Sequence, residues 1–252
     1  GTSRWCCGRP IFHTRWNAFT RSSSHDPSEA RGIKLLIVGY GKMGRMVEEL
    51  AAAEGFEIAG RVDQGRDEWA GADVAIDFST ADALLSNFKQ YTSRRLPAVI
   101  GTTGWNAHVD RLRAEAQKAG IGVVASGNFS IGVNVFQLVV AEAARLMTSQ
   151  PQFGTWIHEI HHAAKPDAPS GTGLLLRDAM LAAGFKRTID ISSARAGMIP
   201  GTHTVGFDSA SDTIELIHRA RDRRGFASGA LLAARWVQGR TGWFNMQDVL
   251  RT

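Results

Sequence analysis

Short apolar runs alternate with longer amphipathic stretches along the first half of the chain. Strands are predicted at 33–38, 56–62, 73–78, 97–100 and 121–125, and helices at 45–53, 81–92 and 107–119. The first of these segments, 33–38, is a short apolar, β-rich run, which is typical of a strand buried on both faces of a parallel sheet. The regular order of strand, helix and strand predicts an α/β fold, with a doubly wound parallel sheet of the Rossmann type and right-handed crossovers.

The pattern changes after residue 129. A long amphipathic stretch predicts a helix at 132–147, and strands then dominate with a single helix among them. These strands are predicted at 153–162, 189–195, 203–209 and 212–219, with the helix at 171–184. The order predicts a second, α+β domain with an open sheet, either antiparallel or mixed. A last helix is predicted at 227–237.

Residues 1–31 differ in character from the rest of the chain. They contain five Arg against one Asp and one Glu, are rich in Ser, lack Lys and show no periodicity. This composition resembles an organelle transit segment, and a tag or a translated upstream sequence has the same features. We expect a disordered leader outside the fold. Both cysteines, Cys6 and Cys7, lie in it, so the remaining chain has no thiol for a disulfide, a nucleophile or a Cys-type zinc site.

Charge and hydropathy exclude two classes of partner. The 252 residues carry a formal charge of +5, of which residues 1–31 account for +3, so about +2 is left for the rest. So small a charge gives no basic footprint for a polyanion, and we expect no nucleic-acid partner. No run of 18 apolar residues occurs, and we therefore expect no membrane partner.

A glycine-rich loop follows the first predicted strand. The segment Gly39-Tyr40-Gly41-Lys42-Met43-Gly44 has the G-x-G-x-x-G spacing, and Asp63 lies 19 residues past the last glycine. In dinucleotide sites these glycines permit a tight turn and let the backbone approach the pyrophosphate, while the acid binds the ribose. Because the loop lies between a predicted strand and a predicted helix, it predicts a dinucleotide site. The alternative is a glycine-rich turn that binds no ligand.

Two further polar loops fall at the carboxyl ends of predicted strands, where sheets of this class bind their ligands. They are Gly101-Thr102-Thr103-Gly104 and Ser126-Gly127-Asn128-Phe129. Simple turns have a similar composition, but two such loops at one edge of a sheet favour a functional role.

The most informative stretch is 158–172, HEIHHAAKPDAPSGT. It contains three histidines and a lysine, His158, His161, His162 and Lys165. These side chains donate protons or hydrogen bonds near neutral pH. Ser170-Gly171-Thr172 then opens an apolar run, which predicts a helix with a hydroxyl at its N-cap, and a helix amino end suits a carboxylate or phosphate. Together these features indicate chemistry on a small anionic molecule.

The same stretch matches the H-E-x-x-H pattern of zinc peptidases through His158 and His162. That site needs both histidines on one face of a continuous helix. The aromatic and β-branched residues before the pattern, and Pro166 and Pro169 after it, favour a strand instead. With a period of two, Ile157, Glu159 and His161 share one face, and His158, Ile160 and His162 share the other. We expect no metal, and a zinc hydrolase is the least favoured alternative.

Four segments, taken in order, resemble a known family. They are the glycine loop, Gly101-Thr102-Thr103-Gly104, Asn128-Phe129-Ser130-Ile131-Gly132-Val133-Asn134 and the block from Glu159 to Thr172. From about Ile33 to Leu250 the chain resembles the dihydrodipicolinate reductases, also called 4-hydroxy-tetrahydrodipicolinate reductases, of the diaminopimelate route to lysine. The block from Glu159 to Thr172 is specific, because few unrelated proteins should match it by chance.

The resemblance implies a cytoplasmic homotetramer, or a plastid protein if residues 1–31 are a transit segment. It also implies a dinucleotide-binding domain at 32–129, a substrate-binding and oligomerisation domain at 130–224, and a segment at 225–252 that returns to the first domain. The implied cofactor is NADH or NADPH, and the implied partner is a small cyclic dicarboxylate with a conjugated imine.

The resemblance also implies roles for individual residues. His161 and Lys165 act in proton transfer, while His162, Ser170, Gly171 and Thr172 hold the substrate. The nicotinamide end of the cofactor is lined by Gly101, Thr102, Thr103, Asn128 and Phe129. Chemistry agrees, because an imidazole with an ordinary pKa of about 6.5 suits proton donation after hydride addition. Lys165 adds charge stabilisation or a second proton.

Two positions depart from the family's pattern. Many members have one more residue in the glycine loop and an arginine before Met-Gly, where this chain has Lys42. The family's later Gly-Glu-His-Thr is Gly201-Thr202-His203-Thr204 here. Asp63 favours NADH, because a carboxylate repels the 2′-phosphate of NADPH. Lys42, Arg45 and Arg61 lie close enough in sequence to compensate, so we expect use of both cofactors, with NADH at least as good.

Two other functions stay open. Another nicotinamide-dependent oxidoreductase acting on a small anionic substrate, such as an amino-acid or semialdehyde dehydrogenase, explains the first part of the chain but leaves 158–172 without a role. A non-enzymatic NAD-sensing module keeps the glycine loop and Asp63 but has no need of a clustered acid and cation.

Overall fold

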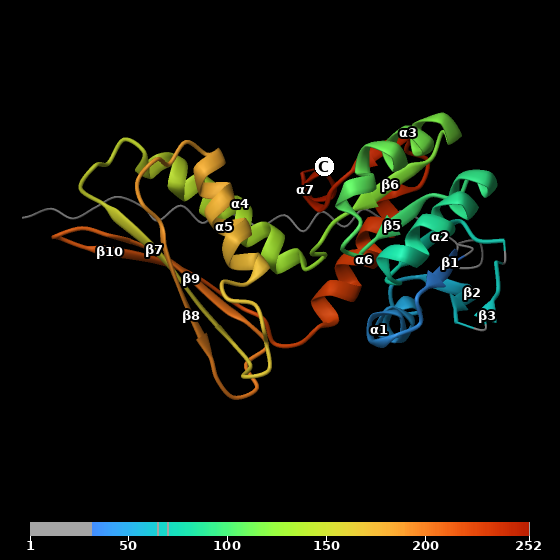
Figure 1. Ribbon diagram of the computed structural model, residues 1–252, viewed down its shortest axis with the longest axis horizontal. Helices are drawn as coiled ribbons and strands as arrows, with labels where there is room; N and C mark the ends of the chain where they lie inside the picture. The colour runs from blue at the N-terminus through green and yellow to red at the C-terminus, as the bar shows by residue number, and fades with distance from the viewer. Residues whose placement is uncertain (1–31, 65, 70, 252) are drawn as a thin grey trace, which may run out of the picture. The chain divides into compact units, whose positions relative to one another are not determined.

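The computed structural model describes residues 32–64, 66–69 and 71–251, and the leader expected at 1–31 lies outside the described residues. Two sheets organise the described part of the chain (Figure 1). Within that part, no helix is both long and apolar enough to cross a membrane.

The first sheet has seven strands in the order β11-β6-β5-β4-β1-β2-β3. The strands are β1 (Ile33–Val38), β2 (Phe56–Asp63), β3 (Arg66–Asp67), β4 (Val74–Asp77), β5 (Ala98–Ile100), β6 (Gly122–Ala125) and β11 (Gly242–Phe244). Neighbouring strands are parallel, except that β2 and β3 pair antiparallel. The doubly wound parallel sheet predicted from the alternation of strand and helix is confirmed.

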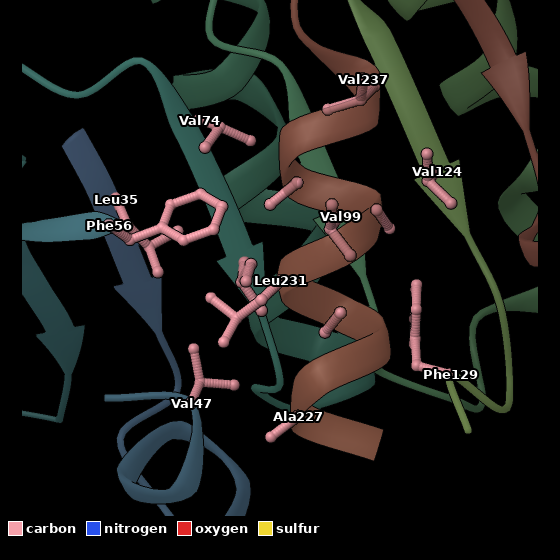
Figure 2. Close-up of a cluster of buried hydrophobic side chains, with 14 of the residues drawn as sticks. Leu35, Val47, Phe56, Val74, Val99, Val124, Phe129, Ala227, Leu231 and Val237 are labelled. Atoms are coloured by element: carbon pink, nitrogen blue, oxygen red, sulfur yellow. The ribbon is translucent and has the colours of Figure 1, made fainter. Parts of the chain in front are cut away.

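Helices cover both faces of this sheet (Figure 1). They are α1 (Lys42–Ala51), α2 (Ala81–Arg94), α3 (Val109–Ala119) with the 3-10 turn η1 (Asn106–His108) before it, α6 (Arg224–Val237) and α7 (Met246–Leu250). Leu35 and Ile37 of β1 join a core cluster with α1 and α6, whereas Leu36 and Val38 join a second cluster with α2 and α3. The last four residues of β1, 35–38, are buried on both faces of the sheet, and all four are apolar. Figure 2 shows the first cluster, with α6 packed over the strands.

A buried carboxylate at the end of β4 fixes the loop that follows β5. Asp77 is fully buried and accepts hydrogen bonds from the hydroxyls of Ser79 (2.6 Å), Tyr91 (2.6 Å) and Thr102 (2.9 Å). Burial, followed by the charge of Asp77, raises the pKa of the Tyr91 phenol, so this phenol stays a donor. The loop that contains Thr102 is therefore held at the carboxyl edge of the sheet.

The second sheet has four strands in the order β10-β9-β7-β8. They are β7 (Gly154–His161), β8 (Asp190–Arg195), β9 (Thr202–Asp208) and β10 (Thr213–Arg219). The β7–β8 pair is parallel and the other pairs are antiparallel. Of the two arrangements expected from the sequence, the sheet is therefore the mixed one.

Two helices, α4 (Ile131–Met147) and α5 (Gly171–Ala182), cover one face of the second sheet (Figure 1). The core between them contains Phe136, Ile157, Leu176, Val205 and Phe207. By the register of the strands, Trp156, Ile160 and Ile217 lie on the other face. No helix of the described residues covers that face (Figure 1).

The last part of the chain packs on the first sheet. Helix α6 contributes to the first core cluster, and β11 pairs in parallel with β6. The strands β3 and β11 and the helix α7 were not predicted from the sequence, because segments of two to five residues carry too little periodicity. At Gly229 of α6, a Cβ atom would lie 1.7 Å from the carbonyl oxygen of Phe129. This contact requires glycine, since a backbone oxygen cannot move aside as a flexible side chain does.

We expect Gly229→Ala to lower the free energy of unfolding by about 2–3 kcal/mol, because the added methyl group forces α6 away from the 126–130 loop. Gly225→Ala is the matched control in the same helix, where the new Cβ would meet its nearest atom, Ser130 Oγ, at 3.7 Å. It should change the free energy by less than about 1 kcal/mol. Urea denaturation measures both, and equal losses would contradict the proposed close approach.

Candidate active site

The glycine loop has the geometry of an anion site at a helix amino end. Gly39 adopts a φ of 83°, and a Cβ there would lie 2.5 Å from the backbone of Phe78. At Gly44 a Cβ would lie 2.3 Å from the Gly39 carbonyl oxygen, so this glycine lets α1 pack closely. At Gly41, the N-cap of α1, a Cβ would have no atom within 4 Å, and no side chain caps the helix. The first N–H groups of α1 are thus available to a bound phosphate, and the loop fits a dinucleotide.

Two arginines and two acids lie around this loop. The hydroxyl of Tyr40 donates to Glu48, which also forms an ion pair with Arg61. The guanidinium carbons of Arg45 and Arg61 lie 5.7 and 5.6 Å from the centre of the Tyr40 ring. Asp63, at the end of β2, is exposed, and its carboxylate accepts a hydrogen bond from the N–H of Gln64 at 2.9 Å. The acid expected after the second strand is therefore at the strand's carboxyl end, as a ribose-binding acid requires.

The two polar loops at the carboxyl edge of the first sheet contribute only some of their side chains to a cavity that His161 also lines. Thr103 and Asn128 line it. Thr102 is buried against Asp77, and the ring of Phe129 is 1% exposed within the first core cluster. Their side chains stabilise the loops rather than face the cavity.

A cavity of about 790 Å³ is lined both by the loops at the edge of the first sheet and by residues of the 158–172 stretch. Of the residues expected to act in catalysis or substrate binding, all six line it: His161, His162, Lys165, Ser170, Gly171 and Thr172. The glycine loop and Asp63 do not line this cavity. The lining also includes His203, His218 and Asp167, for which the sequence suggested no role.

Residues 154–161 form strand β7, so the predicted strand is confirmed and the helix needed for an H-E-x-x-H zinc site does not exist. Along β7, Ile157, Glu159 and His161 are buried on the face covered by helices. His158 lies on the opposite face, where its Nδ1 is 2.7 Å from the hydroxyl of Ser192.

The amino end of α5 is capped by Ser170, which is 2% exposed. Its hydroxyl donates to the Glu159 carboxylate and accepts a hydrogen bond from the N–H of Gly173 at 3.1 Å. The Nε2 atom of His203 lies 3.2 Å from the same oxygen. Because the single hydroxyl proton goes to Glu159, His203 must be the donor in that contact. The hydroxyl of Ser170 is thus fully engaged inside the protein.

Glu159 is fully buried and holds a negative charge. Its Oε1 atom accepts hydrogen bonds of 2.8 Å from the Ser170 N–H, the Ser193 hydroxyl and the Arg195 guanidinium. Burial by itself raises the pKa of the carboxyl, but the hydrogen bonds from Ser170, Arg195 and Ser193 outweigh it and bring the pKa to about 2. The alternation in β7 placed Glu159 beside His161, but gave no sign of Arg195, which comes from β8.

His161 faces this carboxylate. Its Nδ1 atom is 3.8 Å from Glu159 Oε2, and its ring meets that of His203 at 5.0 Å between centres, nearly perpendicular. Burial lowers the pKa of His161, while Glu159 raises it and Lys165 and Arg195 lower it further. Burial also lowers the pKa of His203 to about 4, so this second imidazole is neutral at physiological pH.

The ammonium of Lys165 is 2.7 Å from the carboxylate of Asp167. The hydrogen bond from Lys165 lowers the pKa of the Asp167 carboxyl. Arg195 also donates to the carbonyl oxygen of Asp167, so it ties the 163–169 loop to the buried Glu159.

Glu159, His161 and His203 place potential metal ligands within 4.8 Å of one another. The fit to a metal is poor, because Glu159 already accepts hydrogen bonds from two serines and pairs with Arg195. A divalent cation would lie beside the Arg195 cation and would displace donors from the carboxylate. The three groups therefore fit a hydrogen-bonded network better than a metal centre.

Comparison with known proteins gives a consistent result. Residues 66–129 match the model of the dihydrodipicolinate reductase N-terminus, and residues 132–250 match that of its C-terminus. The 4-hydroxy-tetrahydrodipicolinate reductase of Christiangramia forsetii is 35% identical over 86% of this chain and 98% of its own length. That of Methanoregula boonei is 36% identical over 86% of this chain and 97% of its own.

Solved structures agree on the fold. A dipicolinate-bound dihydrodipicolinate reductase from Paenisporosarcina sp. TG-14 has a TM-score of 0.72 at 20% identity, covering 85% of this chain and 97% of its own. An amine dehydrogenase from Mycobacterium smegmatis has a TM-score of 0.53 at 11% identity, covering 86% and 95%. On the matches to the family models and to the two sequence relatives, the chain is an oxidoreductase that belongs to the dihydrodipicolinate reductase family.

Proposed function

We propose that the protein is a NAD(P)H-dependent 4-hydroxy-tetrahydrodipicolinate reductase, which forms tetrahydrodipicolinate by way of dihydrodipicolinate in the diaminopimelate route to lysine. The observation that carries the proposal is the cavity in which His161, Lys165 and Thr172 meet Thr103 and Asn128. Its volume of about 790 Å³ suits small molecules. An acid, a cation and a helix amino end thus surround a space at the ligand edge of a dinucleotide-type sheet.

In this proposal the chain forms two domains with different functions. Residues 32–129 and 225–252 make the dinucleotide-binding domain, because β11 and α6 belong to the first sheet and its core. Residues 130–224 make the substrate-binding and oligomerisation domain, built on the second sheet.

The cofactor is held by the glycine loop and the sheet edge. The amino end of α1 at Gly41 takes the pyrophosphate, and Asp63 takes a ribose hydroxyl. Thr103 and Asn128 serve the nicotinamide end. Residues Gly39, Tyr40, Lys42, Met43 and Gly44 complete the loop, and Gly101, Thr102 and Phe129 support the nicotinamide side. When bound, the cofactor supplies the hydride.

The enzyme uses both NADH and NADPH, and its kcat/KM with NADH is at least as high as with NADPH. Asp63 repels a 2′-phosphate, and Glu48 offsets the charge of Arg61. Arg45 and Arg61, both near the Tyr40 ring, still supply positive charge on this side of the loop. The charges of opposite sign explain why neither cofactor is excluded.

His161 is the proton donor of the reaction. Hydride addition to a conjugated imine leaves an enamine-like anion, and a proton must be delivered to it. His161 lines the cavity and is shielded from solvent, with 7% of its surface exposed. The ammonium of Lys165 stabilises the developing negative charge or supplies a second proton.

The dicarboxylate is held at the amino end of α5. Gly171 and Thr172 line the cavity at the first turn of this helix, whose N–H groups suit a carboxylate. Ser170 contributes through the cap it forms, because its hydroxyl is already engaged with Glu159. His162 also lines the cavity and contacts the substrate in this proposal.

The open face of the second sheet is proposed to form the contacts of a homotetramer. Trp156, Ile160 and Ile217 lie on this face, and the Ile217 side chain is 41% exposed. Apolar side chains gathered on an uncovered sheet face are typical of subunit contacts.

We expect His161→Gln and Lys165→Ala each to lower kcat by about 100-fold or more, while the affinity for cofactor stays near wild type. The assay follows NADH or NADPH loss by absorbance, with substrate formed from pyruvate and aspartate semialdehyde. The control is His158→Gln, on the opposite face of β7, which should keep its activity. A near-normal kcat in either test variant would show that the assigned role is wrong.

Gly41→Ala should raise the Kd for NADH and for NADPH about tenfold or more, because the new methyl group occupies space needed by the pyrophosphate. Its stability should not change, since no protein atom lies within 4 Å of the added Cβ. Gly71→Ala, which is equally unobstructed, is the control. Fluorescence titration gives the Kd values; unchanged cofactor affinity in Gly41→Ala would rule out this cofactor arrangement.

Ile217→Asp should dissociate the tetramer, because it introduces a charge into an apolar contact. Ile214→Asp is the matched control, since Ile214 is 40% exposed in the same strand but faces the helix-covered side. Light scattering coupled to gel filtration reports the mass. A wild-type monomer, or equal dissociation of both variants, is incompatible with the proposed interface.

A further inference from the structure

We propose that Glu159 is a positioning residue of this site, whose buried carboxylate holds the amino end of α5 and also supports the positive charge of His161. The inference rests on the proposed function, in which His161 donates a proton and α5 binds the substrate. It assigns both tasks to one anion that is fully buried, with 0% exposure, and that does not itself line the cavity.

The two oxygens of Glu159 have different surroundings. Oε1 accepts three hydrogen bonds of 2.8 Å, from the Ser170 N–H, the Ser193 hydroxyl and Arg195. Oε2 accepts only the Ser170 hydroxyl by a close contact and otherwise faces two imidazoles, with His203 Nε2 at 3.5 Å and His161 Nδ1 at 3.8 Å. One oxygen therefore binds the scaffold, and the other faces the proposed proton donor.

The Nδ1 atom of His161 has no hydrogen-bond partner among the described residues, although it is buried. The imidazolium form carries a proton on this nitrogen, and the negatively charged Glu159 Oε2 lies 3.8 Å from it. The Nε2 atom lies beside Gly201, where a Cβ would approach it to 3.0 Å. Glycine at 201 thus leaves room next to the nitrogen that is available to the substrate.

Charged and titratable groups from four strands and one loop surround His161. They are Glu159 of β7, Lys165 and Asp167 of the loop, Arg195 of β8, His203 of β9 and, beyond it, His218 of β10. Lys165 and Arg195 oppose a positive charge on His161, and Asp167 is exposed and paired with Lys165. Burial, with contributions from neighbouring charges, keeps His203 neutral, and burial lowers the pKa of His218. Glu159 is therefore the buried anion that counters the two cations.

The same carboxylate sets the position of α5. It binds both the N–H and the hydroxyl of Ser170, and Gly173 lets the helix approach, since a Cβ there would lie 3.1 Å from Glu159 Oε2. A shift of Glu159 would move the anion-binding turn and the environment of His161 together.

The test compares Glu159→Gln with Arg195→Gln, because both break the same 2.8 Å ion pair but remove charges of opposite sign. The pKa of His161 is measured by ¹⁵N NMR titration, assigned with His161→Gln, and independently from the pH profile of kcat/KM. A proton donor must be protonated, so activity is lost as pH rises through its pKa. In Glu159→Gln this loss should begin about 1 pH unit lower than in wild type. In Arg195→Gln it should begin at higher pH than in wild type.

Ser193→Ala removes one hydrogen bond from Glu159 without removing charge, and it should leave the pH profile of kcat/KM unchanged. Shifts of the same sign in both Gln variants, or no shift in either, would falsify the inference and leave Glu159 a purely structural group. If Glu159→Gln does not fold, Glu159→Asp takes its place, since it keeps the charge but withdraws the carboxylate from His161 Nδ1, and the loss of activity should again begin at lower pH than in wild type. Because NMR reports the His161 pKa without turnover, a wild-type protein inactive as a reductase would refute the proposed function separately.

Discussion

The part of the site built on the second sheet depends on one buried negative charge. Glu159 joins β7 to β8 through Arg195 and to the start of α5 through Ser170. A carboxylate removed from water is stable only when hydrogen-bond donors or cations compensate its charge, and these contacts supply both. The requirement explains why an arginine and two serines, one of them the N-cap of α5, converge on one point of the second sheet. Without that anion, the helix amino end and the imidazole of His161 would have no common anchor.

The first sheet positions a polar loop and the amino end of a helix at its carboxyl edge. Its parallel strands end at one edge, and Asp77 holds the loop containing Thr102 there by hydrogen bonds from buried hydroxyls. The glycine loop at the same edge leaves the amino end of α1 without a side-chain cap. The chain thus provides one helix end suited to a cofactor phosphate and another, at α5, suited to a substrate carboxylate. The cavity between Thr103 and His161 is where those two ligands would meet in the proposed reductase.

Much of this arrangement follows from local sequence pattern. The apolar run at 35–38 is typical of a parallel sheet. The alternation along β7 predicts that Glu159 and His161 share a face, because side chains in a strand alternate with a period of two. Arg195 and His203 were not predicted as partners of Glu159, because strand pairing brings them together from 36 and 44 residues away. Short elements such as β11 were missed for a related reason, since three residues pair only where a neighbouring strand is already formed. The engagement of the Ser170 hydroxyl also depends on tertiary contact.

In the proposed reaction, a hydride and a proton are transferred to a cyclic dicarboxylate imine. The most direct measurement supplies the condensation product of pyruvate and aspartate semialdehyde with NADH deuterated at the transferred position, and analyses the product by mass spectrometry and NMR. We expect one deuterium in each tetrahydrodipicolinate formed, with an equal amount of NADH oxidised. No oxidation of NADH or NADPH above the protein-free rate, or a product without the label, would contradict it.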